Sequence, residues 1–211
     1  MTVTAVIPFR PKNPKTRLSC VLEPEERDLF AGMMLSEVVD AVVSGGCQPL
    51  ILATEPFSFG DVPVLISTSG LNDALNAFLA QQDGPILIIM ADIPLATGES
   101  VKRMVSTSED MSMVPGRGGG TNAIFLSRGS LFRVDYYQAS FLKHVAIAKE
   151  RVLSCEIVDS FRIHTDIDEK EDLVELLIHG RGKSRRYLEE LGFHLSIEKG
   201  RVGVEREKEE Q

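Results

Sequence analysis

The chain has 211 residues, carries a net charge of −8, and draws 43% of its residues from the hydrophobic types. This length suits one well-buried domain and is short for two. We therefore expect a single domain over 1–211, with a core over about 1–180 and a C-terminal helix and hairpin over 184–205. The acidic balance argues against nucleic-acid and membrane-surface partners, which usually bind basic domains. Three scattered cysteines without metal-ligand spacing, and no leader-like segment, predict a cytoplasmic protein.

Apolar runs and helical periodicity alternate along the first half of the chain. Strands are expected over 2–9, 49–55, 62–68 and 85–91, and helices from Pro24 to Gly45, over 71–82 with Asn72 as its cap, and over 97–107. The second half predicts strands over 111–115, 123–127, 151–158 and 161–165, helices over 138–149 and 168–180, a hairpin over 193–205 turning at Lys199-Gly200, and a solvated tail from residue 206. Strands alternating with helices predict a three-layer α/β/α, Rossmann-like fold around a mixed, mostly parallel central sheet.

A basic loop, "PFRPKNPKTRL", follows the first strand. It carries Arg10, Lys12, Lys15 and Arg17, and its prolines predict a stiff, non-helical backbone. Ligands of open α/β sheets bind beyond the carboxyl ends of the strands, where this loop begins. The sequence has no GxxxxGKS pattern, so any polyphosphate would be bound by side-chain cations. The alternative is a solvated surface loop, as short charge runs often are.

Carboxylates follow two later strands. Asp92 ends the apolar run "PILIIMAD", and Asp166 and Asp168 follow "FRIHT" at alternate positions, which points both side chains the same way in an extended segment. One or two protein carboxylates together with substrate phosphates are the usual ligands of Mg²⁺. Helix capping is the alternative role for Asp92 and for Asp168.

A glycine-rich turn, "GRGGGTN", precedes the strand at 123–127. Its glycines allow backbone amides to approach an anion closely, and Thr121 adds a hydroxyl. Ser140 stands near the start of the next helix, where a small anion could bind, and His144 follows one turn later. A flexible surface turn and a packing histidine are the alternatives. Zinc is not expected, since the chain has no HxxH or CxxC pattern.

In this order and spacing, "PFRPKNPKTRL" with "LEPEER", "GLNDALNAF", "MADIP", "GGGTNAI", "SFLKH" and "DIDEKEDL" resemble the nucleotide-diphosphosugar transferase-like superfamily. Within it, the chain is most similar to the 2-phospho-L-lactate guanylyltransferase family of deazaflavin coenzyme F-420 biosynthesis, over residues 3–178. The resemblance implies that the phosphate of 2-phospho-L-lactate attacks the α-phosphorus of GTP. Some relatives use phosphoenolpyruvate instead.

The resemblance also implies a role for each motif. The cations of the basic loop would hold the triphosphate, with Lys15, Arg17 and Asp92 as the catalytic groups. Asp92 and Asp168, with Asp166 as a helper, would bind Mg²⁺, or Mn²⁺. The nucleoside would lie against Leu71, Asn72 and Ala74, and the acceptor against Gly120, Thr121, Asn122, Tyr137 and Ser140. Tyr137 departs from the family, since relatives often carry glycine at this position.

Three alternatives stay open. The first keeps the fold but changes the substrate to a sugar phosphate or a molybdenum cofactor, although Pro-Lys-Asn-Pro stands where such relatives carry a glycine-rich loop. The second is a non-catalytic nucleotide-binding module, which the retained carboxylates disfavour. The third is an α/β domain without a site. A homodimer is the expected assembly, because closed twofold assemblies dominate among oligomers.

Overall fold

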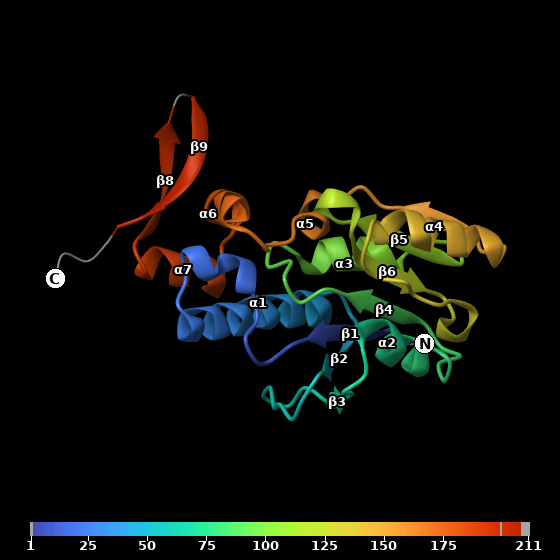
Figure 1. Cartoon of the computed structure of the whole chain (residues 1–211). Helices are drawn as coiled ribbons and strands as arrows, with labels where there is room; N and C mark the ends of the chain where they lie inside the picture. Colours follow the sequence, from blue (N-terminus) through green and yellow to red (C-terminus); the bar gives the residue numbers. More distant parts are fainter. Residues whose placement is uncertain (1, 199, 208–211) are drawn as a thin grey trace.

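The computed structural model describes residues 2–198 and 200–207, and a seven-stranded sheet lies at its centre (Figure 1). The strands, in the spatial order β3-β2-β1-β4-β6-β5-β7, are β1 Thr4–Phe9, β2 Gln48–Ala53, β3 Val64–Ile66, β4 Ile86–Ile89, β5 Met111–Pro115, β6 Thr121–Leu126 and β7 Cys155–Ile157. Strand β6 runs antiparallel to β4 and β5, and the other neighbouring pairs of this sheet are parallel. The predicted α/β class with a mixed, mostly parallel sheet is confirmed.

Helices cover both faces of the sheet. The helices α1 Pro24–Ser44, α3 Gly98–Val105 and α5 Phe161–His164 pack on one face, and α2 Leu71–Leu79 and α4 Ser140–Glu150 pack on the other. Side chains alternate across the pleat of β1, so that Ile7 enters the first layer and Val6 the second. The strand β4 is buried along its whole length, as its unbroken apolar run predicts for a central strand.

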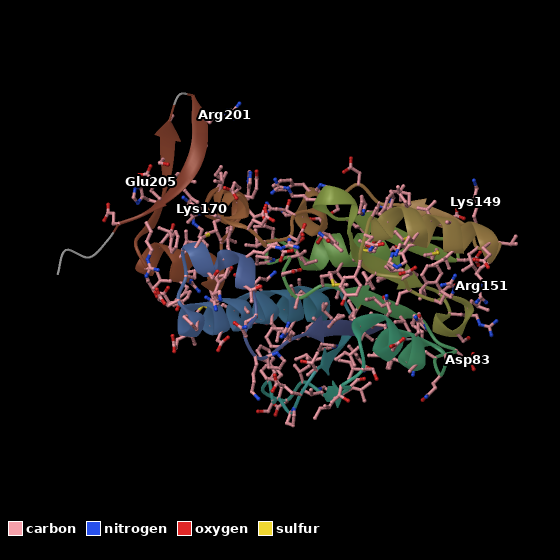
Figure 2. The ribbon with its side chains drawn as sticks, viewed as in Figure 1. Asp83, Lys149, Arg151, Lys170, Arg201 and Glu205 are labelled. Carbon is pink, nitrogen blue, oxygen red and sulfur yellow. The ribbon has the colours of Figure 1, made fainter. Side chains whose placement is uncertain are left out.

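A third apolar cluster joins the C-terminal elements to the first half of α1. These elements are α6 Leu173–His179, α7 Lys183–Glu190, β8 Phe193–Glu198 and β9 Arg201–Arg206, and the 3₁₀ turn η4 Lys170–Asp172 precedes α6. Arg206 closes the base of the hairpin, because its guanidinium donates to Glu26 of α1 at 2.6 and 2.8 Å. From there the hairpin extends away from the sheet (Figure 1). Figure 2 shows Arg201 and Glu205 on it, at the opposite end of the molecule from Lys149 and Arg151.

Several predicted elements differ from the observed ones. The segment "FRIHT" forms the short helix α5 rather than a strand. The helical turn buries Ile163 and allows Thr165 Oγ1 to donate a hydrogen bond to the Phe161 carbonyl. The predicted strand 151–158 shrinks to β7, and the helix expected from residue 168 begins as η4. Arg206 is paired rather than solvated. The predicted turn falls partly on residue 199, which lies outside the described residues, as do 208–211.

None of the described helices combines the length with the apolar composition that a membrane crossing requires.

Candidate active site

The candidate site lies at the sheet edge where β1 and β4 end. Because β6 is antiparallel to β4, its first residues, Thr121 and Asn122, lie at this same edge. The Met90 amide donates to the Asn122 carbonyl at 2.9 Å, which continues the pairing past the end of β4. Topology therefore brings together the basic loop, the acidic residues and the glycine-rich turn, which are far apart in the sequence.

Asp92 and Asp168 converge on one point. The Ile167 amide donates to the Asp92 carbonyl at 2.9 Å, so the two acidic segments run side by side. The Lys15 ammonium lies between their carboxylates, with Nζ 2.7 Å from Asp92 Oδ2 and 2.6 Å from Asp168 Oδ1. Lys15 thus bridges the two predicted metal ligands, whereas the family resemblance assigned it to the triphosphate.

The charges at this point are closely coupled. Burial by itself would lower the pKa of Lys15, but the charges of Asp92 and Asp168 outweigh it and raise the pKa above its ordinary value. Lys15 is therefore held as a cation. Burial raises the pKa of Asp166, and the negative charge of Asp92 raises it further.

Two carboxylates that meet at one cationic group form an oxygen donor set that suits Mg²⁺. Within residues 2–198 and 200–207, however, no group of three or more His, Cys, Asp or Glu side chains is arranged to hold a metal ion. A divalent cation would therefore have to take the place of the Lys15 ammonium between Asp92 and Asp168. The magnesium site stays a prediction, with these two residues as its ligands.

The basic loop is held in a strained conformation. Asn13 and Lys15 have positive φ angles of 48° and 51°, which non-glycine residues adopt rarely. Arg27 of α1 is buried and donates to the Leu22 carbonyl at 2.9 Å and to Asn13 Oδ1 at 3.2 Å. Sequence reasoning missed Arg27, although a cation on the apolar face of a helix was the available signal. The loop is also not wholly irregular, because the 3₁₀ turn η1 Thr16–Cys20 includes Arg17.

Two cavities adjoin this loop, with volumes of about 320 and 830 Å³. The smaller one contains the cluster of Lys15, Asp92 and Asp168. The larger one is lined by Leu71 and Ala74 of α2, as the resemblance implied for a nucleoside. Pro8, Phe9, Arg10, Asn13 and Met90 line both cavities. The two cavities are therefore neighbours, as two parts of one nucleotide would require.

The remaining loop cations lie on the rim. Lys12 lines the larger cavity and pairs with Glu55, and its side chain is 81% exposed. Arg17 lies 3.5 Å from both Asp168 and Glu169 and is 67% exposed. Exposed pairs of this kind hold their partners weakly. Lys12 and Arg17 are therefore available to turn toward an incoming phosphate chain.

Asn72 does not cap α2 as predicted, and its side chain instead contacts the backbone of segment 134–136. Gly70, not Asn72, caps α2. The Asn72 amide accepts from the Tyr136 N–H at 2.7 Å and faces the Tyr136 carbonyl at 3.4 Å. One helical turn later, Asn76 accepts from the Val134 N–H at 2.7 Å and donates to the Val134 carbonyl at 3.0 Å. The two amides hold segment 134–136 extended against α2, a role for which the Asn-x-x-x-Asn spacing was the only signal.

The glycine-rich turn is shorter than predicted, since Thr121 and Asn122 already belong to β6. The 3₁₀ turn η2 Arg117–Gly119 forms its centre, where Gly118 and Gly119 have φ angles of 68° and 85°. Glycine is required next to it for a different reason. A Cβ at position 116 would come within 2.2 Å of Asn122 Oδ1. Gly120, the residue before β6, is extended.

The predicted acceptor residues divide into two groups. Asn122 Nδ2 donates to the carbonyls of Ile163 and His164 and faces Asp166 Oδ1 at 3.3 Å, so it ties the glycine-rich turn to the acidic segment. Tyr137 is 66% exposed and lines the larger cavity beside Leu71 and Ala74. Its φ angle of 75° lies in the left-handed region, which glycine adopts more readily than a residue with a side chain.

Thr121 and Ser140 form the second group and are buried together with His144. Thr121 Oγ1 lies 3.2 Å from Ser140 Oγ and 2.9 Å from His144 Nδ1. The Asp135 amide donates to His144 Nε2 at 3.0 Å. Burial lowers the pKa of His144 to about 4, so the ring is neutral at pH 7. The structure thus brings Thr121 and Ser140 together as the resemblance implied, and it adds His144 to them.

The free energy of unfolding should fall as the pH is lowered from 6.5 to 4. In this range the unfolded chain binds a proton at His144 while the folded chain does not, so protons favour unfolding. The expected loss is about 2–3 kcal/mol by pH 4.5, relative to the full stability above pH 6.5. Urea unfolding at pH 7 and 4.5 measures it. A His144→Gln variant should lose less over the same range, and an equal loss in both proteins would contradict the assignment.

A Rossmann-like sheet with cations after its first strand, a carboxylate after its central strand and two adjoining cavities beside them fits the class of nucleotidyltransferases. Residues 3–208 match the family model "Guanylyl transferase CofC like". The chain is 58% identical over 202 residues to the 2-phospho-L-lactate guanylyltransferase of Methanoregula boonei, covering 96% of this chain and 94% of that protein. It is 56% identical to the protein of the same name from Methanosphaerula palustris, over 97% and 98% of the two chains. The chain belongs to the CofC-like guanylyl transferase family.

Solved structures agree on the fold. A putative nucleotide-diphospho-sugar transferase from Desulfovibrio desulfuricans G20 superposes with a TM-score of 0.71 over 90% of this chain and 95% of that one. The sequence identity is 15%, so this likeness concerns the fold alone.

Proposed function

We propose that this chain transfers the guanylyl group of GTP to the phosphate of 2-phospho-L-lactate. A phosphate oxygen of the acceptor bonds to the α-phosphorus, and the bond from that phosphorus to the α,β-bridging oxygen breaks. The products are lactyl-2-diphospho-5′-guanosine and pyrophosphate, a step of coenzyme F-420 biosynthesis. The observation that carries the proposal is the 58% identity to a protein of this name over nearly the whole of both chains.

The chemistry agrees with the residues at the site. The acceptor phosphate is already anionic at neutral pH, so the reaction needs no general base. Positioning and electrostatic stabilisation supply most of the catalysis in phosphoryl transfer. Arg10, Lys12 and Arg17 supply positive charge where the triphosphate enters, and Leu71 and Ala74 supply an apolar wall for the nucleoside.

We propose Mg²⁺, with Mn²⁺ as a substitute, as the cofactor, and Asp92 and Asp168 as its ligands. When bound, the metal would neutralise phosphate charge and stabilise the leaving pyrophosphate. Lys15 would then be freed from the two carboxylates and would be available to the phosphate chain. This exchange reconciles the observed bridge with the role that the family resemblance gives to Lys15.

Pyrophosphate release with Mg²⁺ tests the proposal. GTP, ATP, CTP and UTP are crossed with 2-phospho-L-lactate and phosphoenolpyruvate, and release is expected with GTP and 2-phospho-L-lactate. Release with phosphoenolpyruvate alone would correct the acceptor and keep the reaction. If a folded protein that binds GTP released no pyrophosphate with any of these combinations, the proposal would be overturned in favour of a nucleotide-binding module.

We also propose a cytoplasmic homodimer. The hairpin carries exposed apolar side chains away from its base, with Ile197 78% and Val202 50% exposed, which suits burial against a second copy. The three cysteines are unpaired, as in a reducing compartment. Light scattering gives the assembly directly, and a particle of 23.2 kDa at working concentration would refute the dimer.

A further inference from the structure

A continuous chain of polar groups leads from the backbone of Asp135 to the hydroxyl of Ser140. Its members are the Asp135 amide, the His144 ring, and the hydroxyls of Thr121 and Ser140. We propose that His144 is a positioning residue that fixes the hydroxyl protons of Thr121 and Ser140, so that the pair offers one proton to the anionic acceptor substrate. This inference rests on the proposed function and on the acceptor position that the family resemblance implies for Thr121 and Ser140.

The tautomer of His144 follows from its partners. A backbone amide is only a donor, so the Asp135 N–H at 3.0 Å requires a lone pair on Nε2. The ring is neutral, and its single proton therefore resides on Nδ1. Nδ1 is 2.9 Å from Thr121 Oγ1, so the ring donates to the threonine.

The hydroxyl protons can then be counted. The contact between His144 and Thr121 uses the ring proton, and the contact between Thr121 and Ser140 uses one of the two hydroxyl protons. The other hydroxyl proton remains unused, and no further side-chain hydrogen bond of Thr121 or Ser140 occurs in the described part of the chain. With the opposite tautomer, Thr121 would donate to the ring and Ser140 to Thr121. No hydroxyl proton would then remain.

This difference matters for an acceptor that carries a phosphate and a carboxylate. Both groups are hydrogen-bond acceptors at neutral pH, so they need donors from the protein. A hydroxyl pair with one free proton binds such a ligand, whereas a pair that presents only lone pairs repels it. The tautomer of His144 therefore decides whether this part of the site attracts or rejects the substrate.

The surroundings keep the ring in place. His144 is fully buried, and the ring of Tyr136 meets it edge-on with centroids 4.9 Å apart. The charged groups that act on the pKa of His144 are Asp135 and Lys143, which pair with each other at 3.0 Å. Asn72 and Asn76 hold the backbone on both sides of Asp135. The donor that fixes the tautomer is thus itself held by α2.

Two matched variants separate the two contacts of the ring. The His144→Gln side chain can still accept from the Asp135 amide, where Nε2 does, but it lacks the donor to Thr121. The His144→Asn side chain can still donate to Thr121, where Nδ1 does, but it cannot reach the Asp135 amide. In His144→Gln the ring no longer fixes the direction of the hydroxyl protons of Thr121 and Ser140, so the acceptor KM should rise roughly 10-fold.

The GTP KM should stay within about twofold in both variants, and His144→Asn should retain most of the acceptor affinity. If both variants lose stability and both KM values rise together, the role is structural and the inference fails. Wild-type protein that is inactive with both acceptors would instead overturn the proposed function.

A spectroscopic measurement decides the proton arrangement without turnover. In ¹⁵N-histidine-labelled wild-type protein, the ring nitrogens of His144 are assigned by their absence in His144→Gln. A proton on Nδ1 and a bare Nε2 are expected at pH 7. A proton on Nε2 would overturn the inference, whether or not the protein is active on the proposed substrates.

Discussion

The Asp92→Asn variant is expected to lose about a thousandfold or more in kcat/KM. The substitution removes one of the two carboxylates that converge at the Lys15 ammonium, and with it half of the proposed metal-binding charge. The amide is nearly isosteric with the carboxylate, so the backbone bond from Ile167 to the residue 92 carbonyl should persist. Pyrophosphate release at increasing Mg²⁺ concentrations measures the loss.

Asp28→Asn is the matched control, since it makes the same change of charge at an exposed position of α1. Its kcat/KM should stay close to that of the wild type. If Asp92→Asn retained more than about a tenth of the wild-type kcat/KM at every Mg²⁺ concentration, Asp92 would not be a metal ligand of the reaction.

The Lys15→Met variant is expected to bind Mg²⁺ more tightly while it turns over more slowly. Without the ammonium, Asp92 and Asp168 face each other uncompensated, so the metal-free protein should be less stable by about 1–3 kcal/mol. A divalent cation no longer competes with Lys15 for these carboxylates. Mg²⁺ should therefore raise the Tm of the variant more than it raises the Tm of the wild type.

In the same variant, kcat/KM should fall by about 2–4 kcal/mol of transition-state stabilisation, as for the loss of one oriented donor. Lys149→Met is the control, because Lys149 is an exposed cation in the last turn of α4 and lies outside the basic loop. An Mg²⁺-dependent Tm shift in Lys15→Met that is no larger than in the wild type would contradict the exchange between lysine and metal. An unchanged kcat/KM would remove Lys15 from the mechanism.

Much of the fold could be predicted from local patterns. The run at β4 has almost no alternation, which required a strand buried on both faces, and the structure has it at the centre of the sheet. The helix α1 begins at the proline and ends before the glycines that signalled its two ends. The pattern of "FRIHT" misled, because a five-residue apolar-polar alternation fits a strand and a short helix equally well.

The sequence by itself determined that the basic loop follows β1 and that Asp92 follows β4, because the burial pattern of a strand is a local property, and it thereby predicted that both belong to one site. Asp168 was predicted beside them from a strand that the structure shows to be the helix α5. Only the tertiary structure decided which groups bond to each other. Lys15 meets Asp92 and Asp168 across 77 and 153 residues of sequence, and Asn72 meets Tyr136 across 64. Such pairings require distant segments to pack with a precision finer than the length of a hydrogen bond. Local sequence patterns do not encode the relative positions of distant segments.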